Sequence, residues 1–189
     1  MRKSKTTLKS LGTLLVALLM LASCSKDSEQ MGTGLETTDK KGVKMYTADL
    51  GMLNDSGVMG TAELRLDGDQ LTVTIQASGL EPNMVHPQHI HGFTNNSNAT
   101  CPPMSADTDG DGLIELEEGL PFYGPILLSL TPFPMAEDGT INYTQTFTVE
   151  GDLMPLQNRV IVLHGMTIDG VYVATLPVAC GEIKPKGGN

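Results

Sequence analysis

A repeated alternation of apolar and polar residues is the feature that most constrains how this chain can fold. In residues 61–80, TAELRLDGDQLTVTIQASGL, apolar residues stand at every second position on both sides of DGD at 67–69. A period of two places successive side chains on opposite faces of an extended chain, so the pattern favours strands that bury one face. Because Asp-Gly forms tight turns, the stretch predicts a β-hairpin. The expected buried residues are Ala62, Leu64, Leu66, Leu71, Val73, Ile75 and Ala77.

Similar short runs follow along most of the chain. Apolar and β-branched residues recur in 123–131, 141–149, 159–165 and 171–177, and Gly, Pro or Asp bound most of these runs. No segment carries the pattern of an amphipathic helix of three turns. Seven or eight short strands without helices predict an all-β fold, either an antiparallel sandwich or a Greek-key barrel.

The N-terminus has the layout of a lipoprotein export signal. Basic residues precede an apolar run at 11–22, which is too short to span a bilayer. The run ends in LASC, Leu21–Cys24, which resembles a bacterial lipobox. We therefore expect residues 1–23 to be a signal peptide and Cys24 to carry a lipid. The alternative is an ordinary signal peptide followed by a chance cysteine.

The predicted mature chain consists of a tether, one domain and a short tail. Residues 24–42 are polar and without periodicity, which is typical of a flexible tether. The strand patterns place the domain at 43–184, and 185–189 form the tail. The net charge is −10 before the signal peptide is removed. This acidity excludes nucleic acid as a partner. We expect a protein of the bacterial cell envelope, periplasmic or on the outer surface, that meets the membrane only through its lipid.

Three of the four histidines lie close together in MVHPQHIHGF, residues 84–93. Residues two apart on a strand point to the same face, so His89 and His91 can place two imidazoles around one metal. A pair of surface histidines is the alternative. His164 ends a separate β-run and is a further candidate ligand. His86 precedes a proline, and three roles stay open for it: a fourth ligand, a group that supports the ligands, or a surface residue.

The cysteines add a further constraint. With Cys24 assigned to the lipid, Cys101 and Cys180 remain, and an even pair in an oxidising compartment favours a disulfide. Two buried free thiols are the alternative. A disulfide would close a loop worth up to about 4 kcal/mol in the chain-entropy model.

The order of these residues resembles that of the copper/zinc superoxide dismutase family. In that family an HxH pair, a cysteine, a histidine after an apolar strand and a C-terminal ACG motif follow one another. The matching residues here are His89, His91, Cys101, His164, and Cys180 in VACGEI. The resemblance covers about residues 43–184 and implies an eight-stranded antiparallel Greek-key β-barrel. It also implies copper bound by His89, His91 and His164, and a bond between Cys101 and Cys180. The motif HIHG resembles the chordin-type repeat as well.

Two departures from this family bear on activity. No histidine lies between His91 and His164, so the family's zinc ligands and bridging histidine have no counterpart, and we expect no zinc. Pro177 stands where the family has an arginine that attracts superoxide. An acidic protein without a local cation repels this anion. Whether the protein is an enzyme stays open; if it is one, it is a copper-dependent, dismutase-like oxidoreductase without zinc.

The segment DTDGDGLIELEE, Asp107–Glu118, matches the EF-hand-type calcium loop at every constrained position. Calcium prefers six to eight oxygen ligands, which carboxylates at alternate positions can supply. Pro102 and Pro103 exclude a helix of usual length before the loop, and GLP at 119–121 is expected to end the run after it. We therefore expect a structural clip, with a solvated acidic loop as the alternative. The expected ligands are Asp107, Asp109, Asp111, the carbonyl of Leu113, Glu115 and Glu118.

The sequence thus predicts an extracytoplasmic lipoprotein whose dismutase-like domain binds copper and calcium and acts in superoxide metabolism. The alternative is a protein without catalysis, either for copper binding and delivery or as a calcium-stabilised surface interaction module of the chordin type. Metal ions are the expected partners in both cases.

Overall fold

The computed structural model describes residues 42–187, and every strand pairing within them is antiparallel. The predicted all-β fold is therefore confirmed. The strands are β1 (Lys44–Met52), β2 (Met59–Asp67), β3 (Gln70–Ser78), β4 (Gln88–His91), β5 (Ile126–Ser129), β6 (Thr140–Thr148), β7 (Val160–Ile168), β8 (Val171–Glu182) and β9 (Lys184–Pro185). The helical elements are α1 (Leu116–Tyr123) and the 3₁₀ turns η1 (Met104–Ala106), η2 (Gly151–Leu153) and η3 (Leu156–Asn158).

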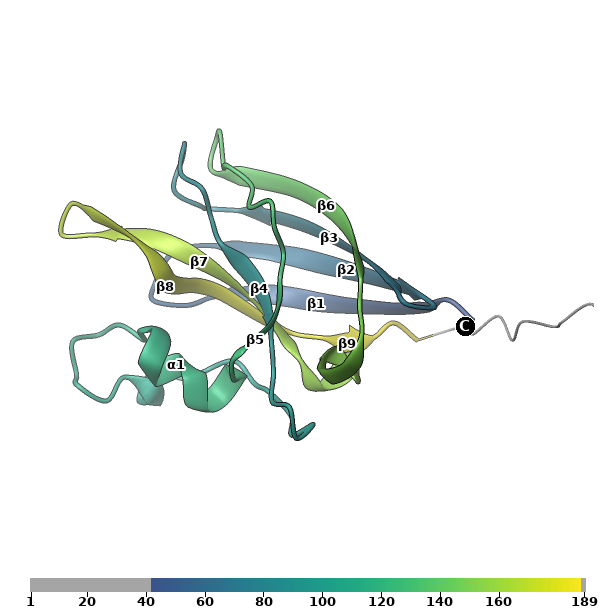
Figure 1. Cartoon of the computed structure of the whole chain (residues 1–189). Coiled ribbons are helices and arrows are strands. Elements are labelled where there is room, and N and C mark those ends of the chain that lie inside the picture. Colours follow the sequence, from purple (N-terminus) through teal and green to yellow (C-terminus); the bar gives the residue numbers. More distant parts are fainter. Residues whose placement is uncertain (1–41, 188–189) are drawn as a thin grey trace, which may run out of the picture. The chain divides into compact units, whose positions relative to one another are not determined.

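The strands form one curled sheet in the order β5-β4-β7-β8-β1-β2-β3-β6, and β9 pairs with β1. Figure 1 shows β1, β2, β3 and β6 side by side in one curved layer. The pairs β3–β6, β4–β7 and β8–β1 join strands that are not consecutive, as Greek-key connectivity requires. In this order β5 and β6 are the two edge strands, so the described sheet curls without closing. The hydroxyl of Tyr143 on β6 donates to the carbonyl of Leu130, just past β5, at 2.9 Å and links the two edges.

The predicted hairpin is present, with β2 and β3 paired from Met59↔Ser78 to Asp67↔Gln70. Each residue expected to face the core from this hairpin is buried. Strand β1, which the sequence reading did not identify, follows the same alternation with Tyr46, Ala48 and Leu50 buried. The core therefore fills the inside of the curled sheet with residues of period two.

Strand β7 is buried on both faces. Ile161 and Leu163 belong to the main hydrophobic cluster inside the curl. Val160 and Val162 point the other way and pack in a second cluster that includes Tyr123 and Cys180. The second cluster lies under the long segment between β4 and β5, which carries α1. Figure 1 shows α1 apart from the sheet, on the side of β8. This segment therefore covers part of the outer face of the sheet.

Helix α1 corrects one expectation. The sequence predicted that Gly119–Pro121 would end the run after the acidic loop, but α1 continues through Pro121 to Tyr123. Proline lies in the second half of a helix of only eight residues, where it removes a single backbone donor. The acidic loop is thus preceded by a 3₁₀ turn and followed by a short helix.

The predicted signal peptide, the lipidated Cys24 and almost all of the tether lie outside the described residues. Within residues 42–187, no helix combines the length and the apolar composition needed to cross a membrane.

Candidate metal centre

Strand β4 places two histidines on the outer face of the sheet. Ile90 points inward to the main cluster, so its neighbours His89 and His91 point outward. In the ladder with β7, His89 is opposite Val162 and His91 is opposite Val160. Both valines belong to the outer cluster. The HxH spacing therefore puts both imidazoles on one face, as the sequence predicted.

His164 continues the alternation of β7 and lies on the same outer face as Val160 and Val162. The register with β8 shifts on both sides of His164, between Leu163 and His164 and between His164 and Met166. The following Gly165 has φ +109°, a conformation that side chains with a Cβ rarely adopt. Such register shifts mark a β-bulge. The ring centroid of His164 lies 5.3 Å from that of His89 and 5.8 Å from that of His91.

The three histidines each offer one ring nitrogen, and these nitrogens lie within 4.8 Å of one another. Two nitrogens that each lie about 2.0 Å from one metal cannot be more than about 4 Å apart. Binding an ion would therefore draw the rings together by up to about 1 Å. Such a rotation is small for side chains, and the group can hold a metal ion.

Hydrogen bonds determine which ring nitrogens of His91 and His164 remain free to bind a metal. Nδ1 of His91 donates to the carbonyl of Gly124 at 2.9 Å, and Nδ1 of His164 donates to the carbonyl of Thr175 at 2.9 Å. With Nδ1 carrying the proton, Nε2 of each neutral ring keeps its lone pair. Among the described residues, both Nε2 atoms and Nδ1 of His89 are buried without a hydrogen-bond partner. Buried polar atoms are rarely left unpaired, so three such atoms on these three rings fit a metal.

Burial keeps these rings neutral. Desolvation lowers the pKa of His91 to about 4 and that of His164 to about 3, and it also lowers the pKa of His89. Only the neutral imidazole is a metal ligand. These three histidines can therefore bind a cation at neutral pH without first losing protons.

His86 does not join this group. Its side chain is fully buried, which rules out a surface role, and both ring nitrogens lie against backbone carbonyls. Nδ1 is 3.0 Å from the carbonyl oxygen of His164, and Nε2 is 3.0 Å from that of Glu81. Of the three roles left open by the sequence, this position corresponds to support of a ligand and not to a fourth ligand.

A pocket of about 240 Å³ opens beside the three histidines. His89 is only half-buried, so the pocket communicates with the surface. The ring of Phe133 packs edge-on against that of His89, with centroids 5.4 Å apart. The other residues that line the pocket are Pro87, Leu116, Ile126, Ala174 and Thr175.

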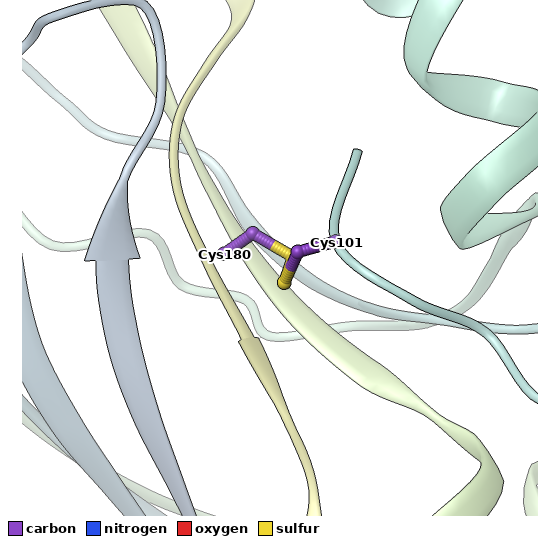
Figure 2. The surroundings of a disulfide bond; sticks show 2 residues. All are labelled: Cys101 and Cys180. Carbon is purple, nitrogen blue, oxygen red and sulfur yellow. A yellow bond between two sulfur atoms is a disulfide. The ribbon is translucent and has the colours of Figure 1, made fainter. Parts of the chain in front are cut away.

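The disulfide between Cys101 and Cys180 is present (Figure 2). It joins the long segment before α1 to β8, and Cys180 belongs to the outer cluster. Tyr123 at the end of α1 lies in the same cluster, and its ring centroid is 4.8 Å from that of His91. The disulfide therefore fastens the segment that covers the histidines. Such bonds are typical of proteins outside the cytoplasm.

The acidic loop brings together only part of its expected ligand set. Carboxylate oxygens of Asp107, Asp109 and Glu118 lie within 4.8 Å of one another. Asp111 and Glu115 are not in this group. The Asp111 carboxylate instead accepts the backbone N–H of Leu113 at 2.8 Å. Three clustered carboxylates repel one another unless a cation or a proton compensates them.

Glu115 and Glu118, at the end of this loop, have pKa values shifted in opposite directions. The side-chain hydrogen bond with Glu118 raises the pKa of Glu115 to about 7. Hydrogen bonds from the side chain and backbone of Thr108 lower the pKa of Glu118 to about 2. Glu118 therefore stays charged, as a carboxylate in the first turn of a helix prefers.

Asn54 anchors the acidic loop to the sheet. Its side-chain amide donates to the carbonyls of Ile114 and Pro177, at 3.0 and 2.9 Å, and its oxygen accepts the N–H of Ile114 at 2.7 Å. Asn54 itself is buried. The loop is thereby fixed at one point whether or not a cation is bound.

Comparison with solved structures finds superoxide dismutase 5 of Candida albicans in its Cu(II) form. The match has 12% identity and a TM-score of 0.45, and it covers 78% of this chain and 95% of that one. No family model matches the chain, and no curated protein matches it. At this level of similarity the match assigns no residue role and no activity to this chain.

Several residues around the histidines were not predicted. Gly124 and Thr175 supply the carbonyls that orient two rings, and Leu116 and Phe133 form walls of the pocket. A backbone carbonyl leaves no sequence signature, and an apolar wall residue looks like any core residue. Their roles follow only from the path of the chain.

Proposed function

We propose that this domain binds one copper ion through His89, His91 and His164. Three buried, unpartnered ring nitrogens on three histidines that lie close together carry this proposal. Imidazole nitrogens suit several transition metals, and among divalent ions of the first row copper binds such sites most tightly. The disulfide supports a location in an oxidising compartment outside the cytoplasm. A domain there would meet copper at the surface of the cell.

Bound copper would supply one-electron redox chemistry. The chain's own residues hold and orient the three rings, through the carbonyls of Gly124 and Thr175, and shield them on one side with Phe133. The pocket reaches solvent past the half-buried His89, so a small molecule can approach. This access supports superoxide as a candidate substrate. Copper binding and delivery without catalysis is the second candidate, supported by the lack of any lysine or arginine in the pocket wall.

Metal content of the purified domain tests the proposal. Wild-type protein and the double variant His89→Ala/His91→Ala are loaded with copper, desalted and measured by elemental mass spectrometry, which also reports zinc. We expect about one copper per wild-type chain and none in the variant, with little zinc in either. Thermal unfolding of the metal-free variant verifies that it is folded. An equal copper content in wild type and variant would refute the site. Superoxide assays are informative only on protein that retains copper.

We also propose that Asp107, Asp109 and Glu118 hold a calcium ion, with Asp111, the Leu113 carbonyl and Glu115 completing the shell. Hard oxygen ligands on a turn with alternate acids are what calcium prefers. Asp107→Asn/Glu118→Gln serves as the variant for this site. It should lose calcium and keep copper, whereas the histidine variant should do the reverse. Loss of both metals in either variant would show misfolding and not loss of ligands.

The lipid anchor at Cys24 is part of the proposed function, since it would hold the domain at the cell envelope. Its support is the lipobox resemblance of Leu21–Cys24. In a bacterial host, metabolic labelling with a radioactive fatty acid should mark the wild type and not Cys24→Ser. A wild-type protein without label would contradict the anchor.

A further inference from the structure

The walls of the pocket beside the histidines are apolar. Apart from the histidines they consist of Pro87, Leu116, Ile126, Phe133, Ala174 and Thr175. Five of these six residues have no polar side-chain atom, and only Thr175 carries a hydroxyl. A volume of about 240 Å³ lies below the usual size of drug-binding pockets. A ligand in this pocket would therefore be small and would meet mostly hydrocarbon.

Positive charge is held away from this pocket. None of the lysines and arginines among the described residues lines it: Lys44, Arg65, Arg159, Lys184 and Lys186. Arg65 pairs with Asp67 at 2.8 Å, and Lys186 pairs with Glu63 at 2.7 Å. The guanidinium of Arg159 donates to the carbonyls of residues 152–154. An anion that entered would meet no cationic side chain.

Negative charge follows one wall residue along the chain. Leu116 begins α1, and Glu117 and Glu118 lie in the first turn of this helix. Moving an anion from water into apolar surroundings without a partner is far more costly than moving a neutral molecule of the same size. Nearby carboxylates add to this cost by lowering the local potential. A neutral diatomic molecule faces neither penalty.

On the basis of the proposed copper site, we propose that the coordination position facing this pocket selects small neutral ligands over anions. The chemical class is that of neutral diatomic molecules, such as carbon monoxide, nitric oxide and dioxygen. Superoxide, as an anion, belongs to the disfavoured class. Ile126 is the position at which this selectivity can be altered, because it lines the pocket while the residue is 50% exposed on the edge strand β5. A charged side chain can replace it there without being buried.

Two probe ligands test this selectivity on copper-loaded protein. Carbon monoxide binding to the reduced form is followed by its infrared stretch, and azide binding to the oxidised form by its charge-transfer absorption. The proteins are wild type, Ile126→Lys and the control Val171→Lys, whose side chain is 64% exposed and does not line the pocket. Copper content is measured first on each sample.

We expect the wild type to bind carbon monoxide and to bind azide more weakly than roughly 1 mM. Ile126→Lys should raise azide affinity by about tenfold through the added cation and leave carbon monoxide binding unchanged. Val171→Lys should behave as the wild type. Tight azide binding by the wild type without a carbon monoxide band, or equal azide affinity in the two lysine variants, would overturn the selectivity alone. Failure to retain copper would overturn the proposed function and this inference with it.

Discussion

Nδ1 of His91 donates a hydrogen bond to the carbonyl of Gly124, the residue directly after α1. Their separation in the chain is 33 residues. The bond ties the tautomer of a candidate metal ligand to the end of the helix that follows the acidic loop. The position of α1 and the orientation of His91 are therefore not independent.

Replacing Gly124 by alanine should disturb this link. Gly124 has φ +77°, and a Cβ there would lie 2.6 Å from the carbonyl oxygen of Gly92. We expect Gly124→Ala to lower the free energy of unfolding by about 1–3 kcal/mol and to weaken copper binding. Urea denaturation and a copper titration measure the two effects. Gly110→Ala is the control, because Gly110 also has positive φ but has open space around it. It should lose stability and keep copper affinity, and a matching loss of copper affinity would contradict the link.

His86 should support copper binding without being a ligand. It lies against the carbonyl of His164 and that of Glu81. His86→Phe keeps a ring of similar size but removes the one hydrogen bond that a neutral imidazole can donate to either carbonyl, and leaving a buried carbonyl unpaired costs about 1–3 kcal/mol. We expect this variant to bind copper several-fold more weakly. Ser56→Ala is the comparison, because it removes a hydroxyl that donates to the carbonyl of Val178 and takes part in neither contact of the His86 ring. It should change stability only, and equal copper affinity in both variants would exclude a supporting role.

The metal-free domain should lose stability as the pH falls below about 6.5. An unfolded histidine takes up its proton near this pH, whereas burial keeps the pKa of His91 at about 4 and that of His164 at about 3. Between these values each of these two histidines binds more protons in the unfolded chain, so both lower the free energy of unfolding as the pH decreases. Glu115, whose pKa is raised to about 7, acts in the opposite direction, but it is one group against two. Urea midpoints at about pH 7.5, 6.5 and 5.5 should fall in that order. His91→Gln should reduce the decline, and an unchanged midpoint in the wild type would refute the burial effect.

Loss of the disulfide should destabilise the domain. Cys101 and Cys180 are 79 residues apart, and a cross-link over a loop of this length constrains the unfolded chain by about 4 kcal/mol in the chain-entropy model. Cys101→Ser/Cys180→Ser should therefore unfold at a markedly lower urea concentration. Reductant should shift the wild type towards this variant and leave the variant itself unchanged. A loss below about 1 kcal/mol would show that packing alone holds the segment.

Calcium should raise the thermal midpoint through Glu118. A ligand that binds only the folded state at about 100 times its dissociation constant adds about 2.7 kcal/mol. Glu118→Gln should abolish most of this gain, since Glu118 belongs to the carboxylate cluster. Glu117→Gln removes a charge from the same turn of α1 but lies outside the cluster, and it should keep the gain. An equal loss in both variants would indicate general screening of charge and no defined site.

Most strands, though not β1, and the shared face of two histidines could be predicted from local patterns. Alternation over residues 61–80 specifies which side chains of β2 and β3 are buried, because a strand has a period of two wherever it lies. The same rule places His89 and His91 on one face. The pairing of Cys101 with Cys180 followed from the number of cysteines and is present. Each of these conclusions can be reached without information on which elements pack against the strands.

The role of His86, the bulge at His164 and the walls of the pocket were decided by tertiary structure. His86 contacts the carbonyl of a residue 78 positions away, and Asn54 holds Ile114 from 60 positions away. Contacts of this kind depend on the path of the backbone, which no local pattern records. Residues 107–118 matched a calcium loop at every constrained position, yet Asp111 lies outside the carboxylate cluster. Spacing along the chain determined which groups could meet, and long-range packing of the β4–β5 segment over the sheet decided which groups do.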